Sequence, residues 1–204
     1  MLTLYFSPKS RASRMLALVH EMDLRDKISL EHMAITRNDG TGAPDPTNPH
    51  PDKKVPSLRD GDTLITESLA IAVYLTDMFP EAGLGPVVGD PQRGPYLTWL
   101  AYYAGVIEPV YNAMVAGVGD HPVFQSSFRG VPEVEARLID TFADGRPYLL
   151  GDKLSAADLL VQSPYMWFPD GAPDDAKVKA WIDRVAARPS YAWVAEVEAK
   201  YEPA

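Results

Sequence analysis

The pattern of apolar and polar residues changes along this chain from strand-like to helical. Residues 2–6 form a short apolar run and residues 27–33 alternate apolar with polar side chains, and both patterns are typical of strands. Between them, apolar residues recur at helical spacing from Met15 to Met22. Residues 36–52 are rich in Gly, Pro, Asn and Asp, which predicts a long surface loop.

The clearest local pattern follows this loop and predicts two strands joined by a tight turn. Pro56 interrupts the first strand, residues 54–58, and cannot donate a hydrogen bond to a sheet. We therefore expect either an edge strand or a segment that is used for something other than pairing. Asp60-Gly61 is a strong hairpin signal, and residues 63–65 supply the returning strand.

Polar cap residues then precede a helix. Glu67 and Ser68 come directly before an apolar helical pattern over residues 69–75. The first turn of such a helix presents backbone N–H groups to a carboxylate, and an unpaired strand beside it can bind an extended peptide. The segment therefore suits a receptor for a short acidic peptide, and an ordinary hairpin with a capped helix fits the same pattern.

A linker and a helical region complete the chain. Residues 80–91 are rich in Pro and Gly, which predicts a linker between two domains. Beyond it the apolar residues follow helical spacing without strand-like alternation. One long helix is expected from residue 93 to 118, bent around Gly105 and Pro109. Further helices are expected at residues 132–143, 174–187 and 190–200.

The segment from Tyr148 to Leu159 carries a second strong local signal. Ser155 and Asp158 have the spacing of a capping box, with Asp in place of the usual Glu or Gln. We expect this pair to fix the start of a central buried helix, which makes both residues structural.

Composition limits the classes of function. The 204-residue chain is 46% hydrophobic and 23% charged, as expected of a globular protein. Its first residues form a strand pattern, and no apolar run reaches the roughly 20 residues of a membrane span, so we expect a cytoplasmic protein without a membrane partner. A net charge of -9 argues against nucleic acid as a partner.

Cysteine and histidine usage removes several kinds of chemistry. The sequence has no cysteine, which excludes disulfides, thiolate zinc sites and dithiol redox motifs. The histidines lack metal-ligand spacing, so no metal is expected; they are His20, His32, His50 and His121.

Val55-Pro56 followed by Glu67-Ser68 resembles the glutathione site of the glutathione S-transferase family, of the bacterial type that uses a serine. The resemblance implies a cis proline, backbone pairing of the preceding residue with glutathione, and a Glu-Ser pair that holds its γ-glutamyl end. It also implies an α/β thioredoxin-like N-terminal domain and an all-α C-terminal domain. The expected limits are 1–79 for the first domain, 80–91 for the linker and 92–204 for the helical domain.

The chain departs from the family pattern in two ways. The family usually has a short helix between its second and third strands, for which residues 36–52 give little support. Its Asn-Pro-x-Gly-Lys-Val-Pro motif is two residues longer here. The lysine that reaches glutathione can therefore be Lys53 or Lys54, and Lys54 is preferred because it keeps the spacing to Val55.

Glutathione would supply the nucleophile, so the protein needs only a group that favours its thiolate. Ser10 is the first candidate, because it lies two residues beyond Pro8, where serine-type members place their activating serine. It can instead simply cap the first helix, and Ser7 competes for that cap. Arg11 is the second candidate, since it takes the cysteine position of cysteine-type members and its charge can stabilise a thiolate.

The predicted function is that of a cytoplasmic, homodimeric glutathione transferase of detoxification type. Glutathione would be its co-substrate, and a small hydrophobic electrophile would bind against the second domain, where Tyr103 and Tyr111 are assigned to the pocket. Two alternatives stay open: another glutathione-dependent enzyme (a dehalogenase, isomerase or peroxidase) and a non-catalytic binding protein of the same fold.

Overall fold

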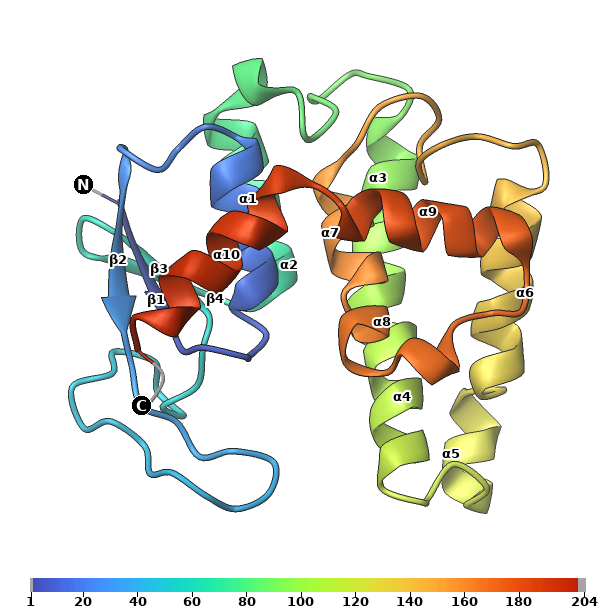
Figure 1. The fold of residues 1–204 in the computed structure, drawn as a ribbon, viewed down its shortest axis with the longest axis horizontal. Coiled ribbons are helices and arrows are strands. Elements are labelled where there is room, and N and C mark those ends of the chain that lie inside the picture. The colour runs from blue at the N-terminus through green and yellow to red at the C-terminus, as the bar shows by residue number, and fades with distance from the viewer. Residues whose placement is uncertain (1, 202–204) are drawn as a thin grey trace. The chain divides into compact units, whose positions relative to one another are not determined.

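A computed structural model describes residues 2–201 of the chain. By its internal contacts the chain divides into two compact units (Figure 1). The first unit contains the residues up to Leu84 together with those from Arg188 onward, and the second contains Gly85–Ala187.

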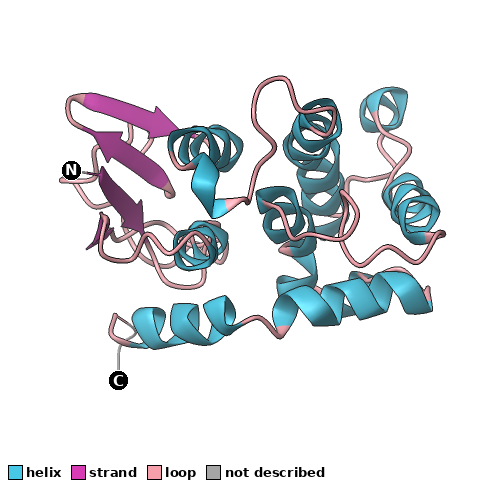
Figure 2. Cartoon of the chain, turned by 90° about the horizontal axis from the view of Figure 1, so that it is seen from above, coloured by secondary structure: helices cyan, strands magenta, loops and turns pink. Residues whose placement is uncertain are grey.

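The first unit is built on a four-stranded mixed sheet. Its strands are β1 (Leu2–Phe6), β2 (Ile28–His32), β3 (Ser57–Asp60) and β4 (Thr63–Thr66). They lie in the order β2-β1-β3-β4; β1 and β2 are parallel, and the other two pairs are antiparallel. Helices α1 (Ser13–Glu21) and α2 (Ser68–Met78) lie against one side of this sheet (Figure 2). A strand-helix-strand-strand-strand-helix order of this kind is the thioredoxin-like arrangement that the sequence predicts.

The expectation of an edge strand around Pro56 is wrong. Strand β3 lies between β1 and β4, so the edges of the sheet are β2 and β4. The strand begins at Ser57, one residue after the proline. Because Pro56 precedes the ladder, its missing N–H costs no inter-strand hydrogen bond and does not force the strand to the edge. The other alternative, a Val55-Pro56 segment outside strand pairing, agrees with the structure.

The loop and the hairpin are confirmed. Residues 36–52 contain no helix or strand, so the family's short helix is replaced by a loop in this chain. Strands β3 and β4 are joined by a two-residue turn, in which Gly61 adopts a φ of 54°. A glycine at the first central position of such a turn is typical of a tight hairpin.

The second unit is helical. The predicted long helix runs as α3 (Arg93–Tyr102) and α4 (Glu108–Val115), joined by a π-helical segment at Tyr103–Ile107. That segment contains Gly105, where the bend was expected. The remaining helices of the unit are α5 (Pro122–Ser127), α6 (Val131–Phe142), α7 (Ala156–Gln162), α8 (Pro164–Trp167) and α9 (Ala176–Ala186). The short helices α5 and α8 were not predicted, because each has fewer than two full turns and no apolar period to detect.

The capping box at the start of α7 is confirmed. The Asp158 carboxylate accepts hydrogen bonds from the Ser155 backbone N–H at 2.9 Å and from the Ser155 hydroxyl at 2.8 Å. It also accepts from the Leu149 N–H at 2.8 Å and from Trp181 Nε1 at 3.0 Å. Asp158 is fully buried, and this desolvation raises its pKa against the effect of the four donors.

The last helix belongs to the first unit. Helix α10 (Pro189–Ala199) packs along α1 (Figure 1). Arg188 at its start donates two hydrogen bonds to the Glu21 carboxylate, at 2.7 and 2.6 Å. The sequence-based domain limits of 1–79 and 92–204 stay a prediction, and the contacts place residues from Arg188 onward with the sheet. No helix among the described residues is long and apolar enough to cross a membrane.

Candidate functional site

The register of the sheet gathers the predicted site residues of the first unit at one end. Ser57 pairs with Thr66, so the residues just outside the hairpin, Pro56 and Glu67, leave it side by side. Ser57 also pairs with Tyr5, so β1 leaves the sheet at that same end. The turn that carries Ser10 follows directly. The ladder therefore brings together segments that lie far apart in the sequence.

The Val55-Pro56 peptide bond is cis, as the resemblance implies. Pro56 is buried and Val55 is half-buried, immediately before the first paired residue of β3. The backbone of Val55 therefore lies outside the ladder, at the end of the sheet where the other site segments meet.

The two candidate lysines have different surroundings. The Lys53 ammonium donates to the backbone carbonyls of Asn48 at 2.7 Å and Pro46 at 3.2 Å, within its own loop. Lys54 is exposed and only weakly paired, with 4.0 Å between its Nζ and the Asp52 carboxylate. The preference for Lys54 as the ligand-binding lysine stays a prediction, now supported by the engagement of Lys53 elsewhere.

Glu67 and Ser68 form the junction between β4 and α2. Glu67 has a φ of 69°, which is uncommon for a residue with a side chain. Strained backbone of this kind often occurs at binding sites. The N-cap residue Glu67 makes no side-chain cap hydrogen bond, so the first N–H groups of this helix retain their capacity to bind an anion. Ser68, expected to be a cap residue, is instead the first residue of the helix.

Arg14 belongs to this site as well, although the sequence pattern favoured a role within the helix or between domains. It lies on α1, is only 5% exposed, and donates from Nη2 to the Ser68 hydroxyl oxygen at 3.0 Å. The hydroxyl hydrogen of Ser68 is then free to point to another acceptor. A charged residue inside an otherwise apolar helix is a signal that could have identified Arg14, because such residues are rarely buried without a partner.

Ser10 lies in the turn between β1 and α1 and is half-buried. Its hydroxyl donates to the Ser7 carbonyl oxygen at 2.7 Å and accepts from the Ala12 N–H at 3.1 Å. These contacts partly agree with the alternative that Ser10 only caps the first helix, because they hold the turn that precedes the helix. Its hydroxyl can donate to a ligand after rotating away from Ser7.

The other polar residues near Ser10 are placed differently. Arg11 is exposed in the turn that precedes α1. Ser13 donates to a Glu198 carboxylate oxygen at 2.5 Å, which engages its hydroxyl with α10. Ser7 is buried and does not cap the helix; its hydroxyl oxygen accepts from Arg37 at 3.2 Å. Arg37 was not predicted at all, and no local pattern in the loop marks it.

The two predicted pocket tyrosines are buried in the second unit. Tyr103 lies in the π-helical segment and Tyr111 on α4, and each is 3% exposed. The Tyr111 hydroxyl donates to the Gly171 carbonyl oxygen at 3.1 Å and lies 3.2 Å from the Tyr165 hydroxyl. Burial raises the pKa of Tyr111 and of Tyr165, so both phenols stay protonated at neutral pH. Their role in a substrate pocket stays a prediction.

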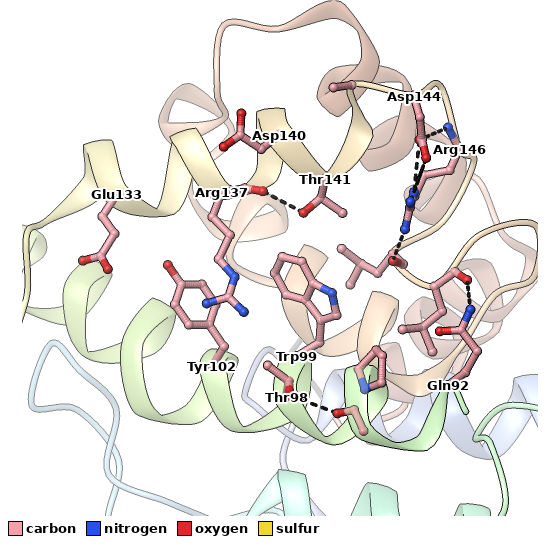
Figure 3. A pocket seen from close by; sticks show the side chains of 15 residues that line it. Gln92, Thr98, Trp99, Tyr102, Glu133, Arg137, Asp140, Thr141, Asp144 and Arg146 are labelled. Carbon is pink, nitrogen blue, oxygen red and sulfur yellow. Dashed lines mark hydrogen bonds and ion pairs between the residues drawn. The ribbon is translucent and has the colours of Figure 1, made fainter. Parts of the chain in front are cut away.

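One hollow in the second unit contains none of the predicted site residues. It is a groove of about 990 Å³ between α3 and α6 (Figure 3). The Arg137 guanidinium lies over the rings of Tyr102 and Trp99, 3.8 and 5.0 Å from their centroids. Such stacking explains the orientation of Arg137 as a packing contact between the two helices. In the described part of the chain, no three His, Asp or Glu side chains are grouped to hold a metal ion.

Comparisons with known proteins agree on one family. Residues 6–78 match the family model described as "Glutathione S-transferase, N-terminal domain". Glutathione S-transferase F9 of Arabidopsis thaliana is 32% identical over 164 residues, which cover 72% of this chain and 74% of that protein. A glutathione transferase from Methylococcus capsulatus has a TM-score of 0.76 at 26% identity, over 98% of this chain and 100% of its own.

A further solved structure is similar and includes a ligand. A glutathione transferase homolog from Sulfitobacter, determined with bound glutathione, has a TM-score of 0.69 at 25% identity. The similarity covers 97% of this chain and 98% of that one.

Proposed function

Because this chain belongs to the glutathione S-transferase family of enzymes, we propose that it binds glutathione at the end of the sheet and activates its thiol for attack on an apolar electrophile. The observation that carries the proposal is the convergence of the Ser10 turn, Val55-Pro56 and Glu67-Ser68 at one end of the β1-β3-β4 ladder. The glutathione found in the Sulfitobacter homolog supports the choice of co-substrate.

The γ-glutamyl carboxylate would bind at the start of α2. Three features favour an anion there: the uncapped N–H groups of the helix, the Ser68 hydroxyl, and the buried Arg14 charge bonded to that hydroxyl. The exposed Glu67 carboxylate would take the α-amino group. The backbone of Val55 would pair with the cysteinyl part, and Lys54 would reach glutathione from the loop.

Thiol activation requires that the protein stabilise the thiolate more than the thiol. A free thiol titrates near 8.5, and a hydroxyl donor or a nearby cation lowers that pKa. We assign the donor to Ser10, whose hydroxyl would turn from the Ser7 carbonyl to the sulfur. A thiolate is a charged acceptor and competes well with a neutral carbonyl. Arg11 stays the alternative, through its charge.

The activated sulfur would then form a bond to an electrophilic carbon. In a substitution, the bond from that carbon to the leaving group would break and its electron pair would leave with that group; in an addition, the π bond would break and its electron pair would take up a proton. The protein contributes by holding the two reactants together and by stabilising the thiolate. Tyr103 and Tyr111 would belong to the wall of the electrophile pocket.

The binding half of the proposal is tested by calorimetric titration of glutathione into wild type and Ser68→Ala. A hydrogen bond to a charged group contributes roughly 1.5 to 3 kcal/mol, so the variant should bind about one to two decades more weakly. Ser127→Ala, an exposed serine of α5, serves as the control and should bind like wild type. A folded Ser68→Ala variant that binds glutathione as tightly as wild type would contradict the assignment of this site.

Family membership is the support for a proposal on assembly and location. We propose a cytoplasmic homodimer that acts in detoxification. Sedimentation should then give a species of twice the 22.4 kDa chain mass at micromolar concentration, and a monomer alone would contradict the proposal.

A further inference from the structure

The loop at residues 36–52 is held to the Ser10 turn by one side chain. The Arg37 guanidinium donates from Nη1 to the Pro8 carbonyl oxygen at 2.6 Å and, more weakly, to the Lys9 carbonyl oxygen at 3.4 Å. Its other nitrogen, Nη2, donates to the Ser7 hydroxyl oxygen at 3.2 Å. One planar group thus contacts three consecutive residues of the turn.

These three residues directly precede Ser10 in the turn, and the first of them, Ser7, contacts the Ser10 hydroxyl. The Ser10 hydroxyl donates to the carbonyl of Ser7, the same residue whose hydroxyl accepts from Arg37. Lys9, between the two contacts, has a φ of 49°, a conformation that residues with side chains adopt only when their surroundings hold it. The guanidinium fork therefore fixes the part of the turn whose conformation sets the position of the Ser10 oxygen.

The loop in turn presents Arg37 in a defined place. The Arg37 N–H donates to the Thr41 carbonyl at 2.8 Å, and the Gly40 N–H donates to the Arg37 carbonyl at 2.9 Å, which closes a tight turn. Gly42 has a φ of 75°, and a Cβ there would lie 2.4 Å from the Ile35 carbonyl oxygen, so a side chain is excluded. The base of the loop is closed by the bond from the Asp45 N–H to the Ala34 carbonyl at 3.0 Å.

The sheet explains why this loop reaches the turn. Strands β1 and β2 are parallel, with Phe6 opposite His32, so the segments after both strands leave the sheet at the same end. This is the end where the site segments converge. The loop takes the place of the short helix that the family usually has there, and its structure depends on backbone turns and on Arg37.

We propose that Arg37 is a positioning residue for thiol activation, acting through Ser10. It holds the Ser7–Lys9 turn so that the Ser10 hydroxyl can be directed to the sulfur of bound glutathione. This inference rests on the proposed function, because it concerns the thiol that the site would activate. It differs from a direct effect of the arginine charge on the thiolate, and the two can be separated.

The test is an ultraviolet titration of the bound glutathione thiolate in wild type and four variants: Ser10→Ala, Arg37→Met, Arg37→Lys and the double variant Ser10→Ala/Arg37→Met. Loss of the Ser10 donor should raise the thiol pKa by roughly one to two units. Arg37→Met should raise it by at least ~0.5 unit, and Arg37→Lys should raise it as well, because lysine keeps the charge and loses the planar fork. The double variant should match Ser10→Ala, since an effect that acts through Ser10 disappears with it.

Two further measurements separate positioning from general damage. Calorimetric affinity for glutathione should stay within about threefold of wild type in the Arg37 variants, because the carboxylate contacts at α2 do not involve this turn. Arg25→Met removes an exposed arginine that pairs with Asp23 in the same unit, and it should leave the thiol pKa unchanged.

The results that would overturn the role of Arg37 differ from those that would also overturn the proposed function. A double variant with a higher thiol pKa than Ser10→Ala, or an Arg37→Lys variant equal to wild type, would mean that charge acts directly and would overturn the inference. A silent Ser10→Ala would overturn it too and would also remove the assignment of the donor to Ser10, while glutathione binding and the Arg11 alternative would stand. A silent Arg37→Met would overturn the inference and leave the proposed function unaffected. A wild-type protein that binds glutathione without lowering its thiol pKa would overturn both.

Discussion

Single polar contacts decide how the site end of the sheet is held. The Ser68 hydroxyl accepts from Arg14, which joins the first turn of α2 to α1. The Ser10 hydroxyl closes the turn before α1 through the Ser7 carbonyl. Each hydroxyl therefore makes a structural contact within the protein. Each also has a hydrogen or a lone pair that is available to a bound ligand.

Ser57 is a buried hydroxyl without such a contact. It is 0% exposed, and its Oγ finds no hydrogen-bond partner within residues 2–201. A buried polar group without a partner loses its hydration and gains nothing in return. Ser57→Ala should therefore raise the free energy of unfolding, by about 1 kcal/mol, as measured by urea unfolding.

Ser155→Ala is the matched control for this prediction. Ser155 is also buried, at 3% exposed, and its hydroxyl donates to Asp158 at 2.8 Å. Ser155→Ala should lower the free energy of unfolding by about 1 kcal/mol, because it removes a satisfied cap contact. Equal effects of the two substitutions would contradict the explanation from hydrogen bonding.

The sequence identified those site residues that are local to one another. Val55 and Pro56 are adjacent, as are Glu67 and Ser68, so a short pattern contains each pair. Arg14 and Ser68 are 54 positions apart, and Arg37 and Pro8 are 29 apart. Their contacts depend on the parallel and antiparallel registers of the sheet, which a single sequence does not determine.

At the scale of secondary-structure elements, the start of α7 is the best-specified helix end. Four donors converge on the Asp158 carboxylate, from the backbone N–H groups of Leu149 and Ser155, the Ser155 hydroxyl and the Trp181 indole. A carboxylate accepts at both oxygens, whereas an amide presents donors at one of its two ends. Asp158 therefore ties α7 to α9 and to the loop before it.

Asp158→Asn tests this arrangement with almost no change of shape. The amide NH2 would face one pair of donors, so we expect a loss of roughly 2 to 4 kcal/mol in unfolding free energy, measured by urea unfolding. Asp152→Asn, an exposed position in the same loop, should change it by less than about 0.5 kcal/mol. A near-neutral Asp158→Asn variant would show that the carboxylate charge is not needed.

The pairing of α1 with α10 makes stability depend on pH. Burial raises the pKa of Glu21, but the hydrogen bonds from Arg188 and Ser190, with the charge of Arg188 and a smaller effect of His20, together hold that pKa below its usual value. A lowered carboxyl pKa stabilises the fold at pH values above the unfolded pKa, near 4.3, and that stabilisation is lost as the pH falls through the folded pKa. The loss should therefore occur in acid.

Comparison of wild type with Glu21→Gln isolates this contribution. At pH 7 the variant should be less stable by ~1 to 2 kcal/mol, since the pair is bidentate but the arginine is partly exposed. The difference should shrink as the pH is lowered from 5 toward 3.5 in a series of urea unfolding curves. Glu196→Gln on the exposed side of α10 is the control, and a difference that does not vary with pH would refute the assignment.

The sequence predicted the positions of the strands and helices better than the break within the long helix. Period and turn chemistry placed the four strands, the 36–52 loop, and the helices that start near residues 13, 68, 131, 176 and 189. The π-helical segment at Tyr103–Ile107 lies where Gly105 indicated a bend, although its hydrogen-bond pattern has no signature in the sequence. The place of β3 inside the sheet follows from strand pairing; the proline rule left two alternatives open, and only the one that put Val55-Pro56 outside the pairing agrees with the structure.

At the scale of the whole molecule, the chain returns to its first unit at its end. Residues from Arg188 onward group with the sheet, and α10 buries Val194 and Val197 there, at 4% and 6% exposed. Ser13 and Glu21 of α1 bond to Glu198 and Arg188 at the two ends of α10. The helix that leads out of the Ser10 turn is therefore supported by the last helix of the chain.

Truncation after Ala187 should consequently unfold the first unit. Burial of two valines contributes about 1.5 to 3 kcal/mol each, and the loss of the polar contacts adds to this, against a total stability of roughly 5 to 15 kcal/mol. Limited proteolysis should then cleave within α1 and α2 of the truncated chain, and a synthetic peptide of residues 188–204 should restore protection when added. A chain that ends at Tyr201 keeps α10 and is the control. Equal protease resistance of the chain that ends at Ala187 would show that α10 is dispensable for the fold of the sheet unit.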